Sequence, residues 1–172
     1  MPGGEMRRGG GPALPGKKQK VLRIHKALTS DPIDMDTLRE VAVSDGGLFS
    51  QEIRRKVWPK LLNINIFCLP PKPGPALHAN HRDYNQVEMD VRRSLRRFPK
   101  GMAEGERSIL QGQLTDMILY VLRNNPELHY YQGYHDIAVT LLLTAGARMA
   151  TAMLQTLSTH HLRYVVTPHT GV

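Results

Sequence analysis

Residues 84–98, YNQVEMDVRRSLRRF, form the clearest helical pattern of the chain. Tyr84, Val87 and Val91 follow one another at spacings of three and four residues, which places their side chains on one face of an α-helix. Arg93 lies almost opposite this apolar face, and Asp90 lies on its flank. The segment therefore predicts a helix with a buried side and a charged, solvent-facing side.

The same spacing recurs along the chain. Short helical patterns occupy residues 21–28 and 36–43, and a longer one follows Ser50, a residue type that caps helix N-termini. Residues 104–124, 134–145 and 147–164 also have helical patterns, whereas the proline-rich residues 63–79 predict a long loop. The sequence has no alternation typical of β-strands, so it predicts an all-α fold.

Length and composition indicate a single globular domain behind a tail. The chain has 172 residues, of which 41% are hydrophobic and 22% charged, values typical of one folded domain. Residues 1–18 contain six glycines and three prolines with few large apolar side chains, and we expect them to be disordered. We therefore predict a disordered basic tail at 1–18, a folded region at 19–164 and an irregular tail at 165–172.

Charge and cysteine content narrow the cellular setting. The formal net charge of +8 predicts attraction to an acidic partner. Cys68 is the only cysteine, which excludes an intrachain disulfide and fits the reducing cytosolic side of the cell. The longest apolar stretch, residues 137–145, is far below the ~20 residues that a membrane span requires.

Three blocks of the sequence resemble the signature blocks of the TBC domain, in the same order and at the usual separation. They are Ile53-Arg54-Arg55-Lys56-Val57-Trp58, Val87-Glu88-Met89-Asp90-Val91-Arg92-Arg93 and Tyr130-Tyr131-Gln132-Gly133. The resemblance covers roughly residues 20–163. It implies an all-helical, multi-helix module that activates Rab GTPases.

By position, the resemblance implies that Arg93 is an arginine finger and Gln132 a glutamine finger. Both would be supplied in trans to the site of a partner GTPase. A guanidinium stabilises charge that spreads over the transferring γ-phosphoryl group, and an amide can orient the attacking water. Gly133, next to the glutamine, permits a close backbone approach and an unusual turn.

Supporting roles are expected for four further residues. Arg54 and Trp58 share a helix face, where the indole can pack in the core and cover the arginine stem. Asp90 is expected to orient Arg93 through a helical ion pair or to pair with Arg54 across helices. Tyr130 is expected to bury its ring and fix the turn that carries the glutamine.

The implied partner is a Rab-family GTPase in its GTP form, which itself carries the GTP and Mg²⁺. We expect the chain to hold no cofactor or metal of its own, because the two histidines of His78-Ala79-Asn80-His81 have no cysteine or carboxylate at ligand spacing. We expect no nucleic acid partner. The resemblance implies action in vesicle transport at the cytosolic face of endoplasmic reticulum and Golgi membranes.

The chain also departs from the family. The family's domain continues for several helices after the third block, whereas residues 165–172 do not continue a helical pattern. The sequence therefore predicts the N-terminal part of the domain, in a C-terminally truncated form. A non-catalytic module that binds a GTPase or another partner stays open as an alternative. A basic helical binder of nucleic acid or anionic membrane is a more remote one.

Overall fold

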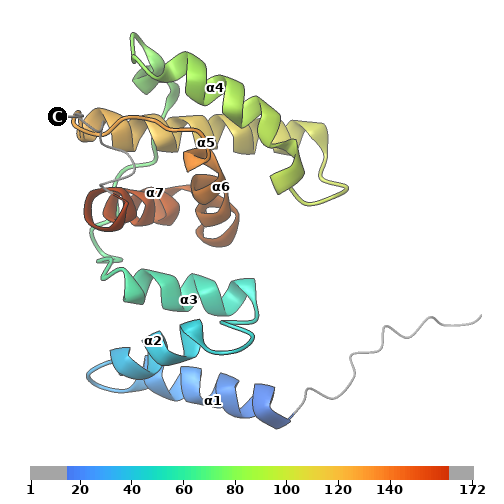
Figure 1. Cartoon of the computed structure of the whole chain (residues 1–172), viewed down its shortest axis with the longest axis vertical. Helices are drawn as coiled ribbons and strands as arrows, with labels where there is room; N and C mark the ends of the chain where they lie inside the picture. Colours follow the sequence, from blue (N-terminus) through green and yellow to red (C-terminus); the bar gives the residue numbers. More distant parts are fainter. Residues whose placement is uncertain (1–14, 163–172) are drawn as a thin grey trace, which may run out of the picture. The chain divides into compact units, whose positions relative to one another are not determined.

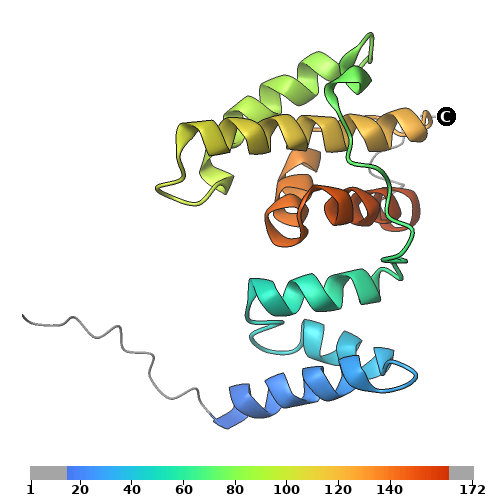
Figure 2. The same cartoon turned by 180° about the vertical axis from the view of Figure 1, so that it is seen from behind.

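A computed structural model describes residues 15–162, which separate into one compact unit up to Phe49 and a second from Ser50 onward. The described residues form seven α-helices and no strand, which confirms the all-α prediction (Figures 1 and 2). Residues 1–14 of the tail expected at 1–18, and the whole of the tail expected at 165–172, lie outside the described residues. Residues 15–18 are helical, so the predicted boundary at residue 18 is too late.

The first unit is a pair of helices, α1 (Pro15–Thr29) and α2 (Met35–Val43). Proline suits the first turn of a helix, where its missing N–H is not needed and where Pro15 stands. Ile24, Leu38 and Val41 are buried between the helices. Asp34 caps α2, because its carboxylate accepts a 3.0 Å hydrogen bond from the Thr37 amide.

The second unit contains α3 (Gln51–Leu61), α4 (Tyr84–Arg93), α5 (Glu104–Asn124), α6 (Tyr134–Ala145) and α7 (Ala147–Thr156). Ser50 caps α3 as predicted, with its hydroxyl 3.2 Å from the Ile53 amide. In Figures 1 and 2, α5 runs between α4 on one side and α6 and α7 on the other. It is therefore the central support of this unit.

Burial along α5 explains that position. Its second half is buried on nearly every side, as expected for a helix enclosed by others: the residues are Leu114, Met117, Ile118, Leu119, Val121 and Leu122. Near its start, Ile109 is 64% exposed, although the helical pattern of residues 104–124 predicts that its side chain faces inward. The covering helices therefore enclose the later turns of α5 and leave this position open.

Two helical predictions are too long. The segment 84–98 ends as an α-helix at Arg93 and continues as the 3-10 helix η2 (Ser94–Arg97), where the backbone amide of Ser94 donates to the Val91 carbonyl three residues back and the turn tightens. Likewise α7 ends at Thr156 and passes into the π-helical turn η3 (Leu157–His161). The predicted loop at 63–79 also contains a 3-10 turn, η1 (Pro75–His78).

Candidate functional site

Four arginines lie within six residues where α4 ends and η2 begins. Arg92 pairs with Glu88 at 2.8 Å, and Arg97 pairs with Asp136. Arg93 is the last residue of α4; its side chain is exposed and makes no hydrogen bond or ion pair within residues 15–162. Arg96, also exposed, is likewise unpaired there. The helix end thus presents two guanidinium groups that are available to another molecule.

The turn before α6 presents Gln132. Gly133 has φ +99°, in the left-handed region that favours glycine, and it caps the helix. The amide of Tyr134 donates to the Tyr131 carbonyl at 3.1 Å across the turn. Gln132 at its apex is exposed and has no side-chain partner in the described chain. The predicted turn is therefore confirmed. A Cβ at Gly133 would meet no atom of residues 15–162 within 4 Å, so no part of the described chain makes the predicted close approach.

A buried carboxylate joins these two segments. Asp90 is only 3% exposed, and its Oδ2 accepts a 2.8 Å hydrogen bond from the phenol of Tyr130. Its Oδ1 accepts a second bond, of 3.3 Å, from the side-chain amide of Gln86. Asp90 stands one turn before Arg93 and Tyr130 two residues before Gln132. The bond therefore couples the position of the arginine helix to that of the glutamine turn.

Tyr130 has the half-buried ring that the sequence predicts. Its ring meets that of Tyr134 edge-on, with centroids 6.0 Å apart. Burial, together with the hydrogen bond to the Asp90 carboxylate, raises the pKa of the Tyr130 phenol. The phenol is therefore protonated at neutral pH and available as a donor.

His135 extends this cluster and was not predicted from the sequence. Its Nδ1 lies 3.0 Å from the Tyr130 hydroxyl and 3.9 Å from Oδ2 of Asp90. The hydroxyl has one proton, which it donates to Asp90, so the ring nitrogen must donate in turn. This arrangement requires a proton on Nδ1 of His135.

A second tie, between Arg97 and Asp136, was also not predicted. The guanidinium makes two parallel bonds, Nε to Oδ1 at 2.8 Å and Nη2 to Oδ2 at 2.9 Å. It holds η2 against the first turn of α6. The two residues are thirty-nine positions apart, and nothing in the local sequence marks them as partners.

The predicted partners of Asp90 are wrong. Neither Arg93 nor Arg54 bonds to it in the described chain, because Asp90 is buried under Tyr130 while Arg93 faces solvent. Arg54 is half-buried and has no side-chain bond within residues 15–162. It is the neighbouring Arg55 that reaches another helix, with Nε 2.9 Å from the Thr144 carbonyl.

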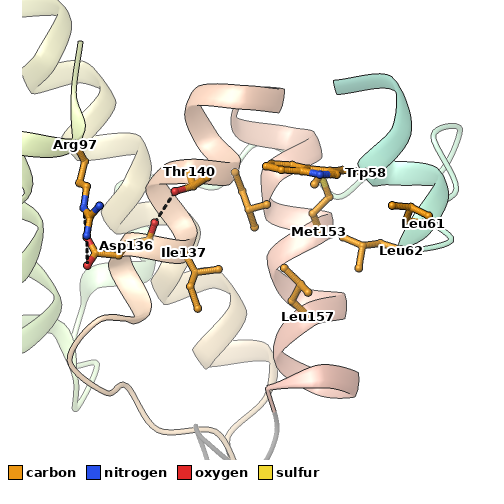
Figure 3. A pocket seen from close by; sticks show the side chains of 10 residues that line it. Trp58, Leu61, Leu62, Arg97, Asp136, Ile137, Thr140, Met153 and Leu157 are labelled. Carbon is orange, nitrogen blue, oxygen red and sulfur yellow. Dashed lines mark hydrogen bonds and ion pairs between the residues drawn. The ribbon is translucent and has the colours of Figure 1, made fainter. Parts of the chain in front are cut away.

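Trp58 packs against the core of the second unit, as expected of a structural residue, but it is only half-buried. Its indole lines an open cavity of about 520 Å³ (Figure 3). We call this cavity the apolar groove. The residues that line it come from α3 and its C-cap, and from η2, α6, α7 and η3: Trp58, Leu61, Leu62, Arg97, Asp136, Ile137, Thr140, Leu141, Met153 and Leu157.

Among residues 15–162, no group of three or more His, Cys, Asp or Glu side chains could hold a metal ion. No helix in that range combines the length and the apolar character needed to cross a bilayer.

The amino-acid sequence matches a known domain family and several known proteins. The family model described as Rab-GTPase-TBC domain matches residues 51–171. TBC1 domain family member 20 of Homo sapiens is 58% identical over 152 residues, which cover 88% of this chain and 38% of that protein. The mouse protein of the same name is 57% identical over the same length.

A more distant relative is the GTPase-activating protein gyp10 of Schizosaccharomyces pombe. It is 31% identical over 141 residues, 78% of this chain and 36% of that protein. The chain thus spans well under half the length of the curated relatives that it matches. The family match starts at Gln51, after the first structural unit, and runs past the predicted boundary at residue 164.

Proposed function

The chain belongs to the Rab-GTPase-TBC domain family, and on this premise we propose that it accelerates GTP hydrolysis by a Rab-family GTPase. Arg93 and Gln132 would be the two groups that it supplies in trans. The observation that carries the proposal is that both side chains are exposed and without a partner in the described chain, on segments joined by the bond from Tyr130 to Asp90.

The chemistry follows from the two functional groups. Negative charge spreads over the γ-phosphoryl oxygens in the transition state, and a planar guanidinium such as that of Arg93 can donate to two of them. The amide of Gln132 can accept from the attacking water and donate to a phosphoryl oxygen. An arginine supplied in trans typically contributes ~10³–10⁵ in rate.

The chain would also hold the arginine and glutamine side chains in position. A finger raises the rate only when it is held close to its working geometry before the partner arrives. Asp90 and Tyr130 provide a buried bond below the exposed pair, and the two parallel bonds between Arg97 and Asp136 add a second tie between the same elements. The unpaired Arg93 loses no internal ion pair when it meets phosphate.

The partner would be in its GTP form and would bring both the nucleotide and the Mg²⁺ ion. The chain would need no cofactor of its own. We place the reaction at the cytosolic face of endoplasmic reticulum and Golgi membranes, in vesicle transport. The net charge of +8 favours approach to an acidic, nucleotide-bearing surface.

A second candidate is a module that binds a GTPase without accelerating hydrolysis. Its exposed arginine and glutamine would then contact the GTPase without being held close enough to their working geometry to raise the rate.

Single-turnover hydrolysis of GTP by a panel of Rab proteins, with and without the chain, separates the two candidates. Acceleration that Arg93→Ala and Gln132→Ala each remove supports the GTPase activator. Saturable binding to the GTP form without acceleration supports the binding module. The absence of both acceleration and binding across the panel contradicts the proposed function.

A further inference from the structure

The second unit has another cavity, which shares no lining residue with the apolar groove. It has a volume of about 270 Å³ and lies where the loop before α4 meets the last turn of α5. Two of its lining residues are charged, and both are arginines: the walls are formed by Asn80, His81, Arg82, Leu122, Arg123 and Pro126. We call this cavity the arginine pocket. Its composition favours a ligand that carries negative charge.

Backbone carbonyls hold both arginines of the pocket in place. Nη2 of Arg82 donates to the carbonyls of Pro126 and Leu128, at 2.8 and 2.7 Å. Nη2 of Arg123 donates to two carbonyls of the segment before α4, at 2.9 and 2.8 Å. A carbonyl group orients a guanidinium but carries no formal charge that would neutralise it. The two side chains are therefore fixed while most of their positive charge stays available.

Each guanidinium also keeps hydrogen-bond donors that no described group uses. A guanidinium has five N–H donors, and the carbonyls engage only those of Nη2. Nε and Nη1 of Arg123 make no hydrogen bond within residues 15–162, and no carboxylate pairs with Arg123 there. Asp83 offsets part of the charge of Arg82, since its Oδ2 lies 3.5 Å from Nε. Nη1 of Arg82 has no partner in the described chain.

His81 adds a neutral donor to the pocket. Its Nδ1 accepts a 3.1 Å hydrogen bond from the backbone amide of Asp83, so this nitrogen carries no proton. Burial of the ring lowers the pKa of His81; the charge of Asp83 opposes this effect, and the charges of the two arginines add to it. The ring is therefore neutral at neutral pH, with its one proton on Nε2.

We propose that the arginine pocket binds a phosphate group, held by Arg82, Arg123 and Nε2 of His81. A phosphate monoester has three terminal acceptor oxygens and a charge of about −1.5 to −2, whereas a carboxylate has two oxygens and a single charge. Donors from three side chains therefore match a phosphate better. Neither Arg93 nor Gln132 lines the pocket, and the inference does not depend on the proposed activity toward a GTPase.

The imidazole Hε1 proton resonance of His81 gives a site-resolved test, and its loss in His81→Gln assigns it. The probe is inorganic phosphate, added at constant ionic strength near neutral pH. We expect the resonance to shift saturably and the midpoint of its pH titration to move to higher pH, because a bound anion favours the protonated ring. Chloride at the same ionic strength should cause neither change. Phosphate bound at Arg93 would leave this resonance in place.

Asn80→Asp places a carboxylate in the pocket without removing either arginine. Asn80 has φ +54°, a backbone conformation that aspartate tolerates as asparagine does. Phosphate affinity should fall by about tenfold or more, because the two like charges would lie close together. Asn63→Asp is the matched control, since Asn63 is exposed, has φ +53° and lies outside the pocket. It should bind phosphate as the parent does.

Arg123→Gln tests the fixed cation directly and should remove the saturable shift. Its control is Arg148→Gln, because Arg148 is also exposed and bonded to backbone carbonyls, those of Leu69 and Pro70, but lies outside the pocket. Loss of such bonds alone should leave phosphate binding unchanged. Circular dichroism checks that each variant keeps its helices, and Asn80→Asp decides the matter if Arg123→Gln unfolds.

A His81 resonance that phosphate does not shift would overturn the proposal. Equal phosphate affinity in the Asn80→Asp and Asn63→Asp chains would also overturn it. Two further probes distinguish the source of the phosphate. Glycerol 3-phosphate that shifts the resonance, without sedimentation of the chain with vesicles containing phosphatidic acid, assigns the pocket to a soluble ligand. Sedimentation that Asn80→Asp removes and Asn63→Asp retains assigns it to a lipid headgroup.

Discussion

The phenol of Tyr130 donates a 2.8 Å hydrogen bond to the buried carboxylate of Asp90, across forty residues of sequence. One partner lies a turn before Arg93 and the other lies two residues before Gln132. The exposed arginine and glutamine thus rest on a common buried contact. A substitution at this contact should displace both the arginine and the glutamine. A substitution of either of those two residues alone should affect only that residue.

Arg93→Lys should lose most of the proposed stimulation although it retains the charge. A lysine is a point charge on a flexible stem and does not reproduce the planar fork of donors. We expect a loss on the order of 10²-fold or more in single-turnover hydrolysis, with little change in GTPase binding. Arg96→Lys, at the unpaired arginine of η2, is the control. If that change is the damaging one, Arg96 rather than Arg93 is the finger.

Gln132→Ala should remove most of the stimulation, and Gln132→Glu should do no better, because it loses the amide donor and adds charge near the phosphates. A Rab whose own switch glutamine is changed to Leu should still be stimulated by the parent chain, because Gln132 would orient the water. Gln113→Ala, on α5, controls for loss of an amide elsewhere. Stimulation that survives Gln132→Ala but vanishes with the Leu-substituted Rab would mean that the GTPase positions its own water.

Tyr130→Phe should reduce the free energy of unfolding by about 1–3 kcal/mol, the usual cost when a buried acceptor loses its donor. Asp90 would keep only the longer bond from Gln86. Urea denaturation followed by circular dichroism measures the change. Tyr131→Phe is the matched control, because its hydroxyl has no hydrogen bond within the described residues. Equal stability of the two variants would show that the bond to Asp90 contributes little.

Asp34→Asn should weaken the acid sensitivity of the first unit. Hydrogen bonds from the amide and hydroxyl of Thr37 lower the pKa of Asp34 below 3.8. The folded state binds this proton less readily than the unfolded state, so the carboxylate's contribution is present above pH ~4 and is lost as the pH falls through the lowered value. Asparagine still caps a helix but does not titrate.

Thermal melts between pH 7 and pH 2 would check this expectation. The melting temperature of the Asp34→Asn chain should fall less on acidification than that of the parent. Asp36→Asn, at an almost fully exposed carboxylate in the same turn, is the control. A parent-like fall in the Asp34→Asn chain would contradict a stabilising role for the charged cap.

The helices of this fold could be predicted from the local sequence pattern, because the apolar residues of a helix face recur every three or four positions. α5 and α6 begin and end where the sequence predicts. The transition at Ser94 could not, since it consists of a backbone amide bonding three residues back, to the Val91 carbonyl, instead of four. Periodicity alone reads α-helix and 3-10 helix as one segment.

The site could be predicted in part. Exposure of Arg93 follows from its position opposite the apolar stripe, and the positive φ of Gly133 follows from the residue type. The packing of α4 and α6 around α5 determines which donor reaches Asp90. That donor lies forty residues away in the sequence, so local spacing does not identify it. Local spacing predicts Arg93 as the partner of Asp90, whereas in the folded chain Asp90 bonds to Tyr130.

That separation has a consequence for synthesis. The whole of α5 lies between Asp90 and Tyr130 in the sequence, so α4 leaves the ribosome before Tyr130 does. At ~5–20 residues per second, the forty intervening residues take roughly 2–8 s to be made. During that interval the Asp90 carboxylate must stay hydrated, and α4 cannot settle in its final place. The contact between Asp90 and Tyr130 therefore forms late, only after residue 130 has left the ribosome.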